Sequence, residues 1–466
     1  MTPFIANTDS DRKLMLDALG LGSVAELFAA IPEKYRFPDL KLPAALSEPE
    51  IFQELSAAAS RNADAGGYAL FAGAGAYNHF VPSVVDALSS RGEFFTAYTP
   101  YQPEASQGTL QALFEYQSMA ADLFGMDIVN ASHYDGASAL AEALLMAWNA
   151  ASRQRSKVVL SSGLHPEYRA VIETYTRNLG ITLCTPGPGT SAGAKTETET
   201  ETKMETETLE SLIDAETACV AVQFPSFFGN LEDYSRLCET AHRNGALFIV
   251  SADPLSLALF EPPGSYGADI VTGEGQPLGN YLSFGGPCLG MFAATKSLVR
   301  KMPGRLAGEA MDGQGRRGYV LTLSTREQHI RREKAVSNIC TNQGLAALRA
   351  AIYLAVMGKN GLKKVADITY RRARYAAGKL GKLPGFSVLN TAPFFREFVL
   401  RCPLDTWEIM NRCAKLKIVP GVPLSRWFPE RTQDILVCVT EMNSRSQIDS
   451  LVSVFETFCG EAASEK

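Results

Sequence analysis

A carboxylate stands at the end of a predicted strand near the middle of the chain. Asp253 follows the apolar run Ala246–Val250, and a second apolar run, Ala268–Thr272, leads into the segment GEGQP at residues 273–277. In open α/β sheets, ligands bind at the carboxyl ends of the strands. A carboxylate in that place can pair with the pyridinium nitrogen of pyridoxal phosphate and keep the ring protonated, so that it acts as an electron sink.

A second feature could hold the phosphate of the same cofactor. Gly136, Ala137 and Ser138 open a predicted helix just after the first strand of the predicted sheet, and the amides and dipole of a helix N-terminus bind phosphate. His133, at the end of that strand, could stack on the ring. Each residue also has an ordinary interpretation: Asp253 as a turn cap, the Gly-Ala-Ser sequence as a plain helix start, and His133 as a strand-end residue.

The third requirement of pyridoxal chemistry is a lysine that forms a Schiff base, and the sequence lacks one where it is expected. Residues 244–295 contain no lysine, arginine or histidine, although the chain carries 44 Lys+Arg. Gln276 and Pro277 occupy the expected position after the second strand. Lys296 is the first lysine after Asp253, and it lies beyond the next predicted strand. We therefore expect that the chain cannot run pyridoxal chemistry alone.

Apolar segments of strand length alternate with helix-length segments between residues 127 and 294. This alternation predicts a mostly parallel seven-stranded sheet with helices on both faces. An α+β pattern follows, so the fold class expected is α/β of the aspartate-aminotransferase type, the fold type I of pyridoxal-phosphate-dependent transferases. The predicted strands are Asp127–Ala131, Val158–Ser161, Ile181–Thr185, Cys219–Phe224, Leu247–Ser251, Asp269–Thr272 and Leu289–Ala294.

Three regions are expected along the chain: an N-terminal helical arm (residues 1–65), a large α/β domain (66–303) and a small α+β domain (304–466). The arm either wraps a partner subunit or forms a surface tail. Within the large domain, Thr190–Glu210 is dominated by Thr-Glu repeats. Such a run cannot bury apolar surface, so we expect a solvated insertion without chemistry.

The bulk composition argues against several classes of protein. A net charge of −6 and a pI near 5.6 disfavour nucleic-acid or anionic-membrane partners, which require a basic surface. No apolar run approaches the roughly 20 residues of a membrane span, and the N-terminal sequence does not have the pattern of a secretory signal. The nine cysteines form no C-x-x-C pair. We expect a reduced, cytoplasmic compartment and no bound metal.

Two further segments present polar side chains. Gly73 and Gly75 partly match a dinucleotide-binding loop, but Asn78 stands where a third glycine is needed; a glycine turn that presents Asn78 and His79 is the better interpretation. In FFTAYTPYQPEASQG (residues 94–108), two prolines keep the backbone out of a helix. This loop is either an interface with buried tyrosines or a rigid ledge that lines a site. The polar side chains expected to project from it include Tyr98, Tyr101, Gln102 and Glu104.

Four motifs together give the chain a family resemblance. They are GAGAYNHFVPSVVD (73–86), AYTPYQPEASQGTLQALFEYQ (97–117), ASHYDGASALAEA (131–143) and REQHIRREKAVSNICTNQ (326–343). The chain resembles, over essentially its whole length apart from the Thr-Glu insertion, subunit 1 of bacterial glycine dehydrogenase (decarboxylating), one chain of the two-chain P-protein of the glycine cleavage system. In that family subunit 2 carries the pyridoxal lysine and subunit 1 is its lysine-less paralogue. This agrees with the absence of lysine from residues 244–295.

The resemblance implies an α2β2 assembly in which this chain completes the active site of subunit 2. Glycine is decarboxylated there on the pyridoxal phosphate of subunit 2, and its aminomethyl group passes to the lipoyl arm of the H-protein. This chain is then expected to bind no cofactor, and the residues of its own pocket are relics: His133, Ser138 and Asp253.

The loop of residues 97–104 is similar to the family segment that reaches the partner's pocket. The residues expected to line that pocket are therefore first Tyr98 and Tyr101, second Thr99, Gln102 and Glu104, and then, near the same entrance, Asn78 and His79. Two other functions remain open: a stand-alone pyridoxal-dependent lyase or aminotransferase that uses Lys296, and a purely structural or regulatory scaffold.

Overall fold

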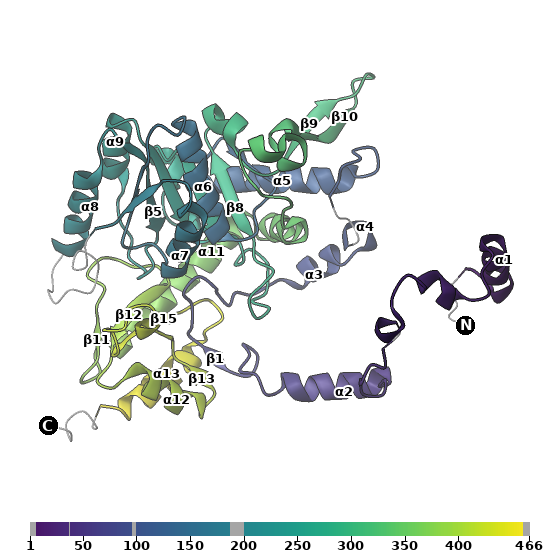
Figure 1. Ribbon diagram of the computed structural model, residues 1–466. Coiled ribbons are helices and arrows are strands. Elements are labelled where there is room, and N and C mark those ends of the chain that lie inside the picture. The colour runs from purple at the N-terminus through teal and green to yellow at the C-terminus, as the bar shows by residue number, and fades with distance from the viewer. Residues whose placement is uncertain (1–5, 37, 96–98, 187–199, 460–466) are drawn as a thin grey trace. The chain divides into compact units, whose positions relative to one another are not determined.

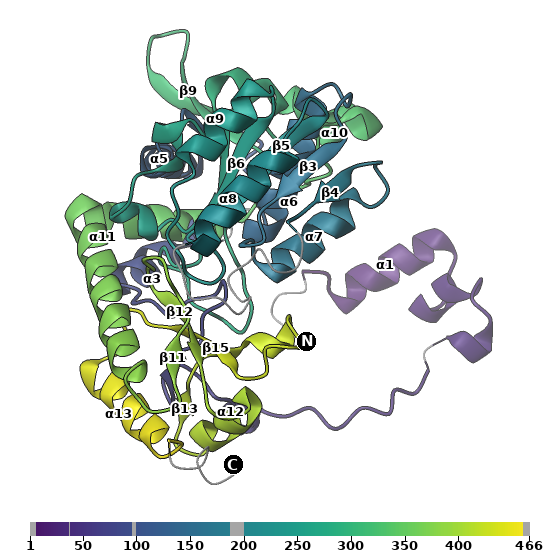
Figure 2. The same ribbon diagram turned by 90° about the vertical axis from the view of Figure 1, so that its left-hand side faces the viewer.

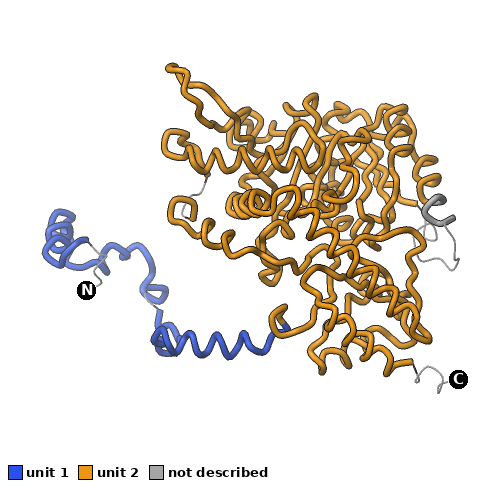
Figure 3. Tube along the Cα trace, turned by 180° about the vertical axis from the view of Figure 1, so that it is seen from behind, with its two compact units in different colours: residues 1–63 blue, residues 64–466 orange. Residues whose placement is uncertain are grey.

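A computed structural model describes residues 6–36, 38–95, 99–186 and 200–459, with the backbone alone for residues 200–204. The chain divides into two compact units, residues 1–63 and 64–466 (Figure 3). The first unit holds helices α1 (Asp9–Leu19) and α2 (Glu48–Ala59) with two short 3₁₀ turns. Both α-helices begin at capping boxes. None of its described residues is buried.

A seven-stranded sheet in the order β2-β8-β7-β6-β5-β3-β4 lies at the centre of the large domain (Figure 1). All pairs are parallel except those of β8 with β2 and β7. The prediction of a mostly parallel seven-stranded sheet is confirmed. Its strands are β2 (Ile128–Val129), β3 (Lys157–Leu160), β4 (Thr182–Cys184), β5 (Thr217–Phe224), β6 (Leu247–Ala252), β7 (Ile270–Glu274) and β8 (Gly290–Ala294).

Both faces of this sheet are covered, because alternate residues of each strand point to opposite sides. On β5, Cys219 and Ala221 belong to the core beneath α6 (Gly136–Ala150) and α7 (Pro166–Thr176). Val220 and Val222 belong to the opposite core. That second face is covered by α5 (Gln107–Phe124), α8 (Thr200–Leu212), α9 (Ser235–Arg243) and the first half of α11 (Gly344–Leu380).

Helix α8 corrects the expectation of a solvated insertion over residues 190–210. Glu205 and Leu209 are four residues apart, on one face of the helix. Leu209 lies in the core, and the buried Glu205 carboxylate accepts hydrogen bonds from Ser161 and Ser162. A composition dominated by Thr and Glu therefore still forms a packed helix here. Residues 190–199 lie outside the described part of the chain.

The C-terminal region contains a four-stranded antiparallel sheet in the order β11-β12-β15-β14. Helix α11 changes direction at Gly358 and extends from the large sheet to this smaller one (Figure 2). The elements are the hairpin β9 (Leu306–Met311) and β10 (Arg317–Thr322), then β11 (Ser387–Val388), β12 (Glu397–Arg401), α12 (Thr406–Ala414), β13 (Ile418–Val419), β14 (Val422–Pro423), β15 (Asp434–Cys438) and α13 (Arg445–Glu456).

One early segment joins the two sheets. Strand β1 (Ala69–Leu70) pairs in parallel with β13 of the small domain, and the chain then continues through residues 73–80 toward the large sheet before the short helices α3 (Ser83–Ser89) and α4 (Gly92–Phe95). A third short helix, α10 (Gln328–Arg331), precedes α11. None of the helices in the described ranges has the length and apolar character needed to cross a membrane.

The close approach of β8 to the start of α6 predicts a sensitive position. A methyl group on Gly290 would overlap the carbonyl oxygen of Asp135 and stand 2.7 Å from the His133 Cβ. We expect Gly290→Ala to lower the free energy of unfolding by about 1–3 kcal/mol, since overpacking forces backbone shifts. Gly313→Ala, at a position with open space, is the control. Equal urea midpoints for both variants would contradict this prediction.

Candidate functional site

Gln276, which stands where the cofactor lysine was expected, holds the segment of residues 73–80. Its side-chain carbonyl accepts a hydrogen bond from the Tyr77 amide at 3.1 Å, and its amide group donates to the Tyr77 carbonyl at 3.1 Å and to that of Asn280 at 2.8 Å. The side chain is buried. A position that would carry the covalent link to the cofactor is therefore used to clamp one backbone segment to another.

Asp253 lies at the end of β6 as predicted, but it is already paired. Its carboxylate is 2.6 Å from the Arg396 guanidinium, and only 3% of the Arg396 side chain is exposed. Arg396 also contacts the Nε2 atom of His79 at 2.7 Å. Because arginine has no acceptor atom, this Nε2 accepts the hydrogen bond. The Nδ1 atom then carries the proton and donates it to Glu441 at 2.6 Å.

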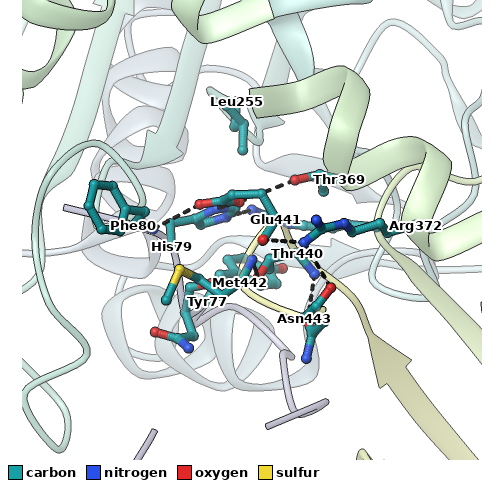
Figure 4. A network of polar contacts seen from close by, with 12 residues as sticks. Tyr77, His79, Phe80, Leu255, Thr369, Arg372, Thr440, Glu441, Met442 and Asn443 are labelled. Atoms are coloured by element: carbon teal, nitrogen blue, oxygen red, sulfur yellow. Dashed lines mark hydrogen bonds and ion pairs between the residues drawn. The ribbon is translucent and has the colours of Figure 1, made fainter. Parts of the chain in front are cut away.

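Figure 4 shows the polar groups that form hydrogen bonds with Glu441. Besides His79, its carboxylate accepts hydrogen bonds from the Phe80 amide at 2.8 Å and the Thr369 hydroxyl at 3.3 Å. Arg372 donates to the Glu441 backbone carbonyl. The network therefore joins the segment of residues 73–80 to α11 and to the end of β15.

Tyr77 covers the other side of the arginine. The Arg396 guanidinium carbon lies 3.2 Å from the centroid of the Tyr77 ring, and the Tyr77 hydroxyl donates to Glu397 at 2.8 Å. Burial raises the pKa of Glu397, although the arginine beside it and two hydrogen bonds oppose the shift. The Asp253 carboxylate, which could otherwise pair with a pyridinium ring, is thus paired with the Arg396 guanidinium.

The N-terminus of α6 is occupied in a similar way, by internal carboxylates. Glu274 accepts hydrogen bonds from the backbone amides of Gly136, Gln276 and Leu289 at 2.8–3.0 Å. Burial raises the pKa of Glu274, and the three amides oppose that shift. Asp135 caps the Ser138 amide at 2.7 Å. Amides that could hold a phosphate already have anionic partners.

His133 packs as a core residue. Its ring stacks on Phe292 with a centroid distance of 4.8 Å and an interplanar angle of 13°. The side chain is buried, and burial lowers its pKa to about 3. Ser138 is engaged in the capping box of α6. Taken with Gln276, Arg396 and Glu274, these contacts mean that the residues present do not fit pyridoxal phosphate.

The candidate loop lies elsewhere, and its described residues, from Thr99 on, are held by several contacts. Pro100 is buried, and the Gln107 side chain donates to the carbonyls of Pro103 and Tyr319 and accepts from the Tyr319 amide. The Tyr101 ring is 55% exposed, while its hydroxyl oxygen accepts from Arg305 at 3.0 Å. Thr99 is half-buried, and Gln102 and Glu104 are exposed. Tyr98 lies outside the described residues.

The structure brings some predicted residues together and leaves others apart. His79 and Asp253 both contact Arg396, so they share one network. Tyr101 contacts Arg305 and His329 instead. Asn78 offers its backbone carbonyl to Thr440. The polar partners of Asn78 and His79 are Thr440, Arg396 and Glu441, none of which contacts Tyr101 through a hydrogen bond.

The whole chain matches known proteins of one kind. The model of the glycine cleavage system P-protein family matches residues 2–455. The chain belongs to this P-protein family. It is 48% identical over 450 residues, 96% of this chain and 98% of the relative, to the probable glycine dehydrogenase (decarboxylating) subunit 1 of Thermomicrobium roseum.

Solved structures agree with this P-protein assignment. A crystal structure of glycine decarboxylase (P-protein) in inhibitor-bound form superposes with a TM-score of 0.88 at 42% identity, covering 98% of this chain and 99% of that one. A sphingosine-1-phosphate lyase from Burkholderia pseudomallei reaches 0.63 at 13% identity, over 94% of each chain, and supports the fold alone. The prediction of a fold type I architecture is confirmed.

Two residues of this network, Glu274 and Arg396, were not predicted from the sequence. Glu274 lies beside Gln276, and a carboxylate directly after a predicted strand was a visible signal. Arg396 gave no such signal, because its partner Asp253 lies in another domain of the chain.

The buried ion pair predicts a large difference between two arginines. Arg396→Leu leaves the Asp253 carboxylate, of which the side chain is only 12% exposed, without its cation, and we expect a loss of about 3–5 kcal/mol in the free energy of unfolding. Arg371→Leu removes a surface pair with Asp367, in which the arginine side chain is 76% exposed, and should cost under about 1 kcal/mol. Similar denaturation midpoints for the two variants would refute the central role of Arg396.

Proposed function

We propose that this chain is the subunit of a two-chain glycine decarboxylase that does not bind pyridoxal phosphate. The enzyme decarboxylates glycine and transfers its aminomethyl group to the lipoyl arm of the H-protein. The observation that carries the proposal is that three residues already have internal partners: Gln276 binds the Tyr77 backbone, Arg396 pairs with Asp253, and Glu274 accepts from the Gly136 amide at the start of α6. A P-protein with these internal pairs needs a second chain that holds the cofactor.

The relatives support this division of work, because those at 48% identity are named subunit 1 of glycine dehydrogenase. We further propose an α2β2 complex with subunit 2, in which this chain completes the partner's active site. The exposure of Tyr101, Gln102 and Glu104 on an anchored loop supports a role for this loop in lining that site, together with Tyr98 and Thr99. The buried contacts of Asn78 and His79 favour a role in joining the domains of this chain.

The alternative of a stand-alone pyridoxal enzyme would rely on Lys296. This residue is exposed and follows β8, which is antiparallel to β7 and pairs Ala294 with Ile270. Lys296 therefore lies past the start of β7, whereas Asp253 follows the end of the parallel strand β6. The two residues are therefore at opposite ends of the strands. This arrangement argues against a cofactor held by both.

Binding of the cofactor to the isolated chain tests the first half of the proposal. We expect no saturable binding of pyridoxal phosphate in equilibrium dialysis, because the groups that would hold it already bind each other. The purified partner subunit, run in parallel, shows that the assay detects a cofactor site. Stoichiometric binding to this chain alone would refute this half of the proposal.

The role of the loop is tested in the complex. In the subunit pair with H-protein, Tyr101→Phe should lower kcat/KM for glycine/CO2 exchange about 10- to 100-fold, the effect of losing one hydrogen bond to a charged group. Tyr281→Phe is the matched control, since Tyr281 is 50% exposed and its hydroxyl binds Asp86 at 2.6 Å. An unchanged rate for Tyr101→Phe would favour the scaffold alternative.

A further inference from the structure

We propose that Arg305 is a positioning residue for Tyr101, which fixes the tyrosine hydroxyl as a hydrogen-bond donor toward the partner's site. This inference rests on the proposed function, in which the loop of Tyr101 lines the active site of the second subunit. Arg305 would orient the Tyr101 hydroxyl, which would then act in the active site of the other subunit.

Arg305 is held firmly before it reaches the tyrosine. Only 4% of its side chain is exposed. Its guanidinium donates to the Cys340 carbonyl at 2.7 Å and to the Asn342 side chain at 3.4 Å, and its Nε lies 3.8 Å from a carboxylate oxygen of Glu327. The guanidinium therefore has a fixed position and a neighbouring counter-charge.

The anchor residues are themselves tied to the large sheet. Asn342 donates to the Ala131 carbonyl at 3.2 Å, and the Cys340 amide donates to the Tyr134 hydroxyl at 3.1 Å. Ala131 and Tyr134 flank the end of β2 and the start of α6. Arg305 thus connects Tyr101, through Cys340 and Asn342, to residues that lie between β2 and α6.

The chemistry of the contact sets the direction of the hydrogen bond. Arginine offers only donors, so the Tyr101 oxygen, 3.0 Å from Nη2, must accept. The proton of the hydroxyl then points away from Arg305. The positively charged guanidinium of Arg305 also polarises the O–H bond of Tyr101, which makes this hydroxyl a stronger hydrogen-bond donor. The group that meets it in the partner's site is then a hydrogen-bond acceptor, such as a carboxylate oxygen.

The ring of Tyr101 is also oriented from the side. His329 packs against it at a centroid distance of 6.0 Å and an angle of 66°, and the guanidinium carbon of Arg305 lies 5.6 Å from the ring centroid. The hydroxyl is held by Arg305 while Tyr101 as a whole residue stays 55% exposed. This is the geometry of a side chain prepared for a surface that docks on it.

A double-mutant cycle in the reconstituted two-subunit enzyme tests the inference. The variants are Tyr101→Phe, Arg305→Met, their combination and Arg305→Lys, each measured for kcat and KM in glycine/CO2 exchange after gel filtration has verified assembly. We expect Arg305→Met and Tyr101→Phe each to lower kcat/KM about tenfold or more, and the double variant to be no slower than either alone. Arg305→Lys, which keeps a donor, should recover part of the activity.

Arg326→Met is the matched control. Arg326 is also a buried arginine, and its guanidinium donates to the carbonyls of Leu323 and Gly304, whereas that of Arg305 donates to Tyr101. It should lose stability without coupling to Tyr101→Phe. If Arg305→Met fails to assemble, the cycle is run with Arg305→Lys in both backgrounds, where the lysine effect must vanish in the Tyr101→Phe background.

The outcomes separate this inference from the proposed function. If Tyr101→Phe lowers the rate but Arg305→Met either leaves it unchanged or lowers it further in the Tyr101→Phe background, the positioning role is overturned and the proposed function stands. If Tyr101→Phe has no effect, the loop's role in the partner's site fails, and this inference fails with it.

Discussion

The buried ion pair between Asp253 and Arg396 is the constraint on which the rest of the structure depends. A buried carboxylate must have a compensating charge, because an unpaired one is strongly destabilising. In a fold type I enzyme that charge would come from the pyridinium ring of the cofactor. Here it comes from an arginine just before β12, so one interaction both supplies the counter-charge and fastens the chain around β12 to the end of β6 in the large sheet.

The same replacement occurs at the other end of the pocket. Glu274 supplies the anion at the N-terminus of α6, and Gln276 uses its side-chain amide to hold Tyr77. Through these hydrogen bonds and the ion pair, the segment of residues 73–80 is connected both to the large sheet, by Gln276, and to Arg396 before β12, by His79. A rigid joint of this kind suits a subunit whose work is to present a fixed surface. We propose that the loop around Tyr101 provides such a surface.

The fold was predictable where local pattern decides the structure. The strands of the large sheet are buried on both faces and therefore appear as apolar runs separated by helix-length segments. The missing lysine was equally visible, because an absence within one strand and its loop is a local property. Helix α8 was predicted wrongly because composition hid the i,i+4 pair of Glu205 and Leu209, and the partners of Glu205 lie about 40 residues earlier in the chain.

The contents of the pocket could not be predicted in the same way. Asp253, Arg396 and His79 come from three distant parts of the sequence, and only the folded chain brings them together. The same holds for Arg305, which reaches Tyr101 across about 200 residues. The family resemblance predicted that the loop lines a site. The contact between Arg305 and Tyr101 is visible only in the structure.

The most direct measurement is the location of the cofactor in the active complex. Borohydride reduction of the assembled two-subunit enzyme, followed by peptide mass spectrometry, identifies each lysine that carries pyridoxal phosphate. We expect a modified lysine in the partner subunit and unmodified lysines throughout this chain. A stoichiometric modification of any lysine of this chain would contradict it.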